Sequence, residues 1–200
     1  MKEFLSALIV IATFSAAPVL AGVVAQAESG QHHAAWVERA LDLTPQERQQ
    51  AEPILRDTAR RMHELHSRTS AAALAALSPD HRSRVREIAA GAHQQLRAHP
   101  EPQHGLTRSE IAPIFTKSAG EIDALLTPQE SQAVLAQRQE FEAGHDAIWA
   151  ETVAQLRPLL SGEQQQKLDA WSAKVKEHEA QRHQPDAGRF LLMAAAPPKG

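Results

Sequence analysis

The sequence predicts an all-α protein of about five long amphipathic helices. A short motif that begins helices recurs five times along the 200 residues, and apolar residues follow its copies at three- and four-residue spacing. The composition agrees, because Ala and Gln are abundant while Cys and Tyr are absent. Large apolar residues are sparse, so the core of a monomer would be thin. We therefore expect elongated helices that complete their burial in a dimer.

The repeated motif has the chemistry of a helix start. The first copy, Leu43-Thr-Pro-Gln-Glu47, returns unchanged as Leu126–Glu130, and looser copies begin at Leu77, Leu106 and Leu160. A Thr or Ser at the N-cap accepts a hydrogen bond from the first turn, and the Glu three residues later reaches back to the cap's own amide. We assign this capping role to Leu43, Thr44, Glu47, Leu126, Thr127 and Glu130. The spacing is regular as well, because 34 residues separate Leu43 from Leu77 and Leu126 from Leu160.

The helices follow from these copies. Apolar residues continue along each segment, and Pro53 should bend the first long helix, since proline removes one helix hydrogen bond. Helix starts are expected at Thr44, Ser78, Thr107, Thr127 and Ser161.

The chain is expected to form one helical domain with a leader and a tail. A Pro/Gly-rich hinge at residues 99–105 separates two related halves, about 36–98 and 106–178, within a domain that spans residues 28–180. Residues 181–200 include an apolar stretch without periodicity, and we expect a flexible tail there.

The N-terminus resembles a secretory signal. After Met1-Lys-Glu, an apolar run extends to about Val24 and ends in Ala25-Gln-Ala27, a small-x-small cleavage pattern. We read residues 1–27 as a signal peptide, with Val19-Leu-Ala21 as a second possible cut and an uncleaved membrane anchor as the alternative. Cleavage would place the mature chain in the periplasm, where no ATP is present.

Histidines are the candidate metal ligands. His63 and His66 are three residues apart on one helix, a spacing that suits two zinc ligands. No third ligand stands at 59, 67 or 70, so a site for zinc or another divalent metal would need one from the terminal histidines. Surface histidines are therefore the favoured interpretation. No known catalytic motif is present, and we expect no enzymatic activity.

The signal, the polar His-containing lead-in and the repeated motif before a long bent helix resemble the Spy/CpxP family of bacterial periplasmic proteins. ZraP and the periplasmic heavy-metal sensors are metal-linked relatives that share the pattern. Where the family has Leu-Thr-x-x-Gln, this chain has Glu47 and Glu130, with Gln46 and Gln129 one place earlier. Either residue can close the capping box. The resemblance covers about 36–98 well and 106–178 more loosely.

This resemblance implies a cradle-like antiparallel homodimer that holds unfolded or partly folded envelope proteins without ATP, as part of an envelope stress response. From helix position alone, we map the client-binding surface to Arg60, Arg61, Met62, Leu65 and Arg68. The alternative is a metal-binding or heavy-metal-sensing protein, with the periplasmic domain of a sensor kinase as a partner. A non-catalytic interaction module is a further alternative, and no nucleic-acid partner is expected.

Overall fold

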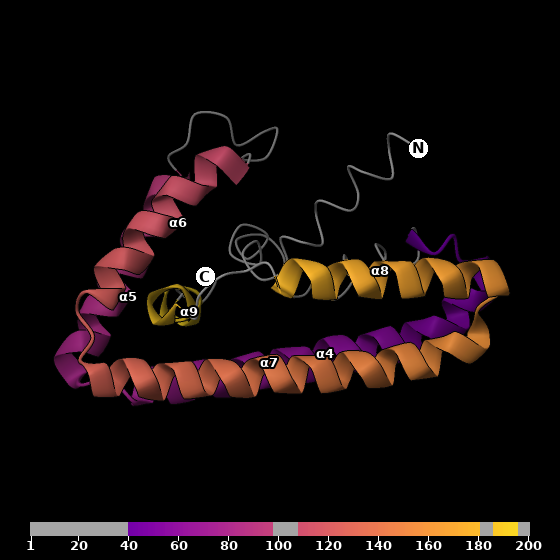
Figure 1. Cartoon of the computed structure of the whole chain (residues 1–200), viewed down its shortest axis with the longest axis horizontal. Coiled ribbons are helices and arrows are strands. Elements are labelled where there is room, and N and C mark those ends of the chain that lie inside the picture. The colour runs from indigo at the N-terminus through magenta and orange to yellow at the C-terminus, as the bar shows by residue number, and fades with distance from the viewer. Residues whose placement is uncertain (1–39, 98–107, 181–185, 196–200) are drawn as a thin grey trace. The chain divides into compact units, whose positions relative to one another are not determined.

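The protein is all-α in the ranges that the structure describes. The computed structural model describes residues 40–97, 108–180 and 186–195, and no strand occurs among them. The helices are α4 (Pro45–Ala75), α5 (Pro79–Arg97), α6 (Arg108–Asp123), α7 (Pro128–Leu156), α8 (Gly162–Ala180) and α9 (Ala187–Ala194), with a 3-10 turn, η2 (Arg157–Leu159), between α7 and α8 (Figure 1). The predicted fold class is therefore confirmed.

Four helices begin directly after predicted caps. Helices α4, α5, α7 and α8 start one residue beyond Thr44, Ser78, Thr127 and Ser161. Helix α6 starts at Arg108, and its predicted cap, Thr107, lies outside the described residues. Helix α4 is 31 residues long and includes Pro53. The bend expected at Pro53 stays a prediction.

The chain divides into two compact units, and each is described by itself here. The described part of the first unit is residues 40–63 and 145–180, and that of the second is 64–97, 108–144 and 186–195. Helices α4 and α7 each contribute to both units. Each unit thus combines residues from both halves of the sequence.

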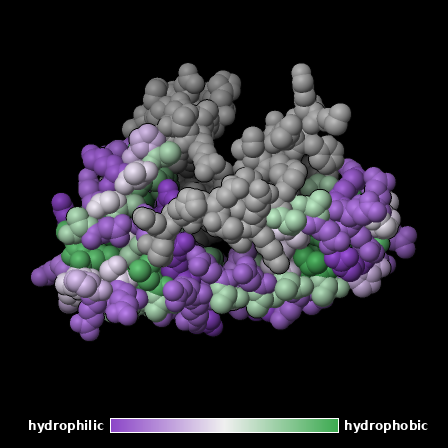
Figure 2. Space-filling view, viewed as in Figure 1, coloured by the Kyte–Doolittle hydropathy of each residue, from purple (hydrophilic) through white to green (hydrophobic). Residues whose placement is uncertain are grey.

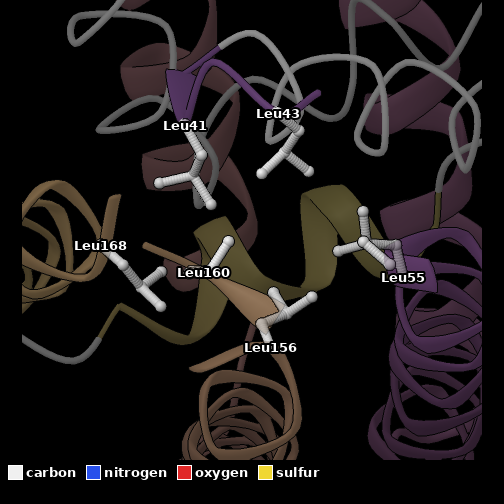
Figure 3. Packing of buried hydrophobic residues seen from close by; sticks show 7 residues of the cluster. Leu41, Leu43, Leu55, Leu156, Leu160 and Leu168 are labelled. Carbon is white, nitrogen blue, oxygen red and sulfur yellow. The ribbon is translucent and has the colours of Figure 1, made fainter. Parts of the chain in front are cut away.

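A cluster of leucines forms the core of the first unit. Leucines before α4, within α4, at the end of α7 and in α8 point toward one another (Figure 3). Leu156 and Leu168 are fully buried, and Asp42, between two buried leucines, adopts a left-handed backbone with φ of 51°. An Asp tolerates that conformation better than a bulkier residue. The cluster consists of Leu41, Leu43, Ala51, Leu55, Leu156, Leu160 and Leu168.

The second unit is built on α5, α6 and α9, which pack against one another. Its fully buried side chains include Val85 of α5, Ile122 of α6 and Val134 of α7. Small residues such as Ala89 and Ala119 are buried between the helices. This core therefore combines large side chains, such as Phe115 and Ile122, with small ones.

Helix α9 corrects the prediction for the C-terminal tail. The stretch Ala187–Ala194 is a helix, and Asp186 caps it by accepting the backbone N–H of Arg189 at 2.8 Å. Phe190, Leu191 and Leu192 are buried. The prediction of a flexible tail is therefore wrong for these residues. Because a helix of eight residues is marginal by itself, its stability depends on the surface that receives it.

No helix in the described part of the chain is long and apolar enough to span a membrane. The predicted signal peptide, residues 1–27, lies outside that part.

Candidate functional site

In the second unit, one carboxylate joins two helix starts. Glu130 accepts the backbone N–H of Thr127 at 3.0 Å, while the backbone N–H of Glu130 donates to the Thr127 hydroxyl at 3.2 Å. The same carboxylate also accepts the backbone N–H of Ser78, at 2.9 Å, and lies 2.8 Å from Nδ1 of His81. Hydrogen bonds from the amides of Ser78 and Thr127 lower the pKa of Glu130 to about 2. Glu130 therefore caps α7 and α5 together.

The first unit contains an equivalent junction. Glu47 accepts the backbone N–H of Thr44 at 2.8 Å, and Gln164 accepts that of Ser161 at 2.7 Å. The Gln164 side chain then donates from Nε2 to Glu47 at 3.0 Å. The amide of Thr44 first, and Gln164 second, lower the pKa of Glu47. Lys167 adds an ion pair to Asp42 at 2.7 Å.

Four of the five motif copies therefore meet in pairs, which their separate interpretation as helix caps does not reveal. The first copy contacts the fifth, and the second copy contacts the fourth. A signal for this pairing was present in the sequence. The first two copies and the last two copies are each 34 positions apart. When two segments of equal length run antiparallel, the start of each lies beside the end of the other.

The predicted client-binding arginines are paired with acids. Arg61 forms an ion pair with Glu151 of α7, and this hydrogen bond raises the pKa of Arg61. Arg68 pairs with Glu140 of α7 at 2.9 Å. Arg60 is exposed and pairs with Asp57, which lies one turn earlier on α4. Exposed ion pairs contribute little to stability, so they can exchange partners at low cost.

The predicted apolar members of that surface differ in burial. Met62 is half-buried, whereas Leu65 is only 6% exposed and belongs to the core of the second unit. Helix α7 approaches Leu65 closely because Gly144 has no side chain. A Cβ atom at Gly144 would lie 2.8 Å from a methyl carbon of Leu65. Leu65 is therefore buried within the second unit, whereas Arg60, Arg61 and Met62 belong to the first.

The two candidate metal ligands have different surroundings. The His63 side chain is exposed. His66 is half-buried, and its ring lies edge-on to Phe141, with the ring centroids 5.8 Å apart. Among the described residues, no group of three or more His, Asp or Glu side chains could hold a metal ion.

Large apolar side chains lie half-buried at the margin of the leucine cluster. The Trp149 and Trp171 rings meet edge to face, with centroids 4.5 Å apart and an interplanar angle of 88°. Each tryptophan keeps part of its surface open. On the face shown in Figure 2, hydrophobic residues form small patches between hydrophilic ones. We call the half-buried set the apolar margin: Ile54, Trp149, Val153, Leu159 and Trp171.

Comparisons with protein-family models, curated proteins and solved structures find no match for this chain.

Proposed function

We propose that this chain is an ATP-independent holdase of the periplasm, which binds unfolded or partly folded proteins. The observation that supports this proposal is the apolar margin of the first unit. Its tryptophan, isoleucine and valine side chains are packed against a buried core yet remain partly accessible. The resemblance to the Spy/CpxP family and the predicted signal peptide supply the compartment and the class of client.

A holdase needs apolar contacts that stay dispersed. One continuous apolar surface would drive the protein itself to associate, whereas small apolar patches among charged residues retain a flexible chain only while it exposes apolar groups. The margin lies in the same unit as the ion pair between Arg61 and Glu151. Charges of this kind speed the capture of a flexible chain, and apolar contacts slow its release.

The direct test is an aggregation assay with the mature chain, residues 28–200, in metal-free buffer without ATP. A chemically denatured substrate is diluted into the protein, and light scattering is followed. We expect suppression at ratios near one protein per substrate. Unchanged scattering at a severalfold molar excess would rule out the holdase function. Sedimentation equilibrium at the assay concentration tests the dimer that the resemblance implies.

Two variants test the apolar margin. Ile54→Thr and Val153→Thr keep a β-branched side chain but add a hydroxyl, and Thr matches Val in size and is smaller than Ile. Both changes should weaken client capture while preserving helix content. Gln155→Thr is the matched control, because it places the same residue at an exposed position of α7. If the two variants and the control suppress aggregation equally, the margin does not bind clients.

A further inference from the structure

Helix α9 fills an apolar groove of the second unit. Phe190, Leu191 and Leu192 are 4%, 0% and 2% exposed, although the helix has only eight residues. It packs on α6 and α5 (Figure 1), and the Phe190 ring lies 6.3 Å from that of Phe141 on α7. The buried apolar side chains of α5 and α6 include Ala89, Ala92, Phe115, Ala119 and Ile122.

The groove holds α9 through its backbone as well as its side chains. The backbone N–H of Gly188 donates to Oδ1 of Asp123, at the end of α6, at 2.7 Å. Gly188 also lies so close to α6 that a Cβ there would be 2.1 Å from the carbonyl oxygen of Ala119. The first N–H groups of any helix lack partners within that helix. Asp123 therefore binds a feature that every helix N-terminus offers.

Helix α9 depends on this groove for its structure. Isolated helices shorter than about 12–15 residues are marginal in water, so packing rather than propensity keeps eight residues helical. The carboxyl of Asp123 also lies beside that of Asp186, the N-cap of α9. Two carboxylates side by side oppose docking when both are ionised. The contact thus combines strong apolar packing with a built-in repulsion.

We propose that α9 is an intramolecular competitor, which occupies a groove that binds an apolar helical segment of an unfolded client once α9 leaves. This rests on the proposed holdase function and adds a second, regulated surface to it. The occupant in the structure defines what fits: a short capped helix with a small residue near its start and consecutive large apolar residues. Recognition through a backbone N–H suits clients of varied sequence.

The test compares full-length variants with the parent. Gly188→Ala introduces the clash with Ala119, and overpacking of this kind typically costs 1–3 kcal/mol, roughly a five- to 150-fold change in an equilibrium. Gly120→Ala on α6 is the control, because a Cβ there meets nothing within 4 Å. The probe is a fluorescein-labelled peptide of residues 186–195, measured by anisotropy. We expect Gly188→Ala to bind it about tenfold more tightly than the parent or the control, and to suppress aggregation at lower protein concentration.

A second variant should act in the same direction. Leu191→Ala removes a fully buried side chain of α9 but leaves α5, α6 and the peptide unchanged, so it should release α9 and tighten peptide binding. This arm remains informative if Gly188→Ala does not fold. Equal peptide binding by Leu191→Ala and the parent would overturn the competition.

Three further results would also overturn the inference. Equal peptide affinity of Gly188→Ala and the parent, with helix content retained, would show that α9 does not compete for the groove. If Gly188→Ala binds the peptide more tightly but suppresses aggregation no better than the parent, the groove does not bind clients. Suppression of aggregation by the parent would still support the holdase function. Concentration-dependent dimers of Gly188→Ala, with unchanged peptide affinity, would make the α9 helix of a second copy the occupant instead.

Discussion

Glu130 accepts the backbone N–H of Ser78 across 52 residues of sequence, at a distance of 2.9 Å. The same carboxylate closes the capping box of its own helix with Thr127. A local motif therefore also forms a tertiary contact. This dual role is the basis of the first prediction.

Replacing Glu130 with Ala should destabilise the protein by about 1–3 kcal/mol, because the change leaves the N–H groups of Ser78 and Thr127 without their acceptor. Chemical denaturation followed by circular dichroism measures the loss. Gln129→Ala is the control, since Gln129 is the exposed neighbour in the same motif and should change the free energy of unfolding by less than about 0.5 kcal/mol. Equal losses of stability in Glu130→Ala and Gln129→Ala would contradict the stabilising role of Glu130 at the two helix starts.

The junction of the first unit can be tested by a nearly isosteric change. Gln164→Glu removes the Nε2 donor and places a second carboxylate beside Glu47. We expect a melting temperature several degrees below that of the parent at pH 7, with recovery as the pH falls and one carboxylate is protonated. Gln166→Glu adds the same charge at an exposed position two residues away and should leave the melting temperature nearly unchanged. Equal melting temperatures of the two variants would argue against a role for the contact with Glu47.

The caps themselves should each carry a measurable share of stability. Thr44→Ala and Thr127→Ala both remove a hydroxyl that accepts a first-turn N–H, and each should cost about 0.5–2 kcal/mol. Thr116→Ala at an exposed site of α6 controls for the loss of a threonine. Urea midpoints of the three variants provide the comparison. An organising role for the motif is excluded if the two cap variants match the parent.

Two carboxyl groups of the second unit should respond to pH in opposite directions. The pKa of Glu130 is lowered to about 2, so its contribution to stability is present above the ordinary value of 4.5 and is lost as pH falls toward 2. Partial burial and the neighbouring Asp186 raise the pKa of Asp123 to about 6. Protonation of Asp123 favours α9 docking. This contribution to stability is fully present below about pH 3.8 and is lost as the pH rises through about 6.

Carboxyl carbon NMR across pH 2–8 measures both effects. The Glu130 signal should titrate near 2 and the Asp123 signal near 6. Methyl signals of Leu191 should report weaker α9 docking at pH 7.5 than at pH 5, and this change should be smaller in Asp123→Asn. An Asp123 signal that titrates near 4 would contradict the predicted weakening of docking.

Local chemistry was enough to predict the helical fold and most helix starts. Thr44, Ser78, Thr127 and Ser161 each precede a helix because an N-cap hydroxyl and a residue three positions later act within one turn. The buried positions Ala51, Leu55, Leu65 and Ala73 follow the three-four spacing of one helical face. Such signals lie within a few residues of one another, and the chain reveals them without its tertiary structure.

The partners of those local features depended on the tertiary structure. Glu130 and Ser78 meet only because separate helices bring their starts together, and Leu65 is buried because Gly144 lets α7 approach it. Arg61 and Arg68 lie on α4, where the sequence marks a basic stripe, yet the acids that balance them come from α7. Helix α9 is the clearest case. Eight residues are too few to be helical alone, and α6 and α5 supply the apolar surface against which Phe190, Leu191 and Leu192 pack.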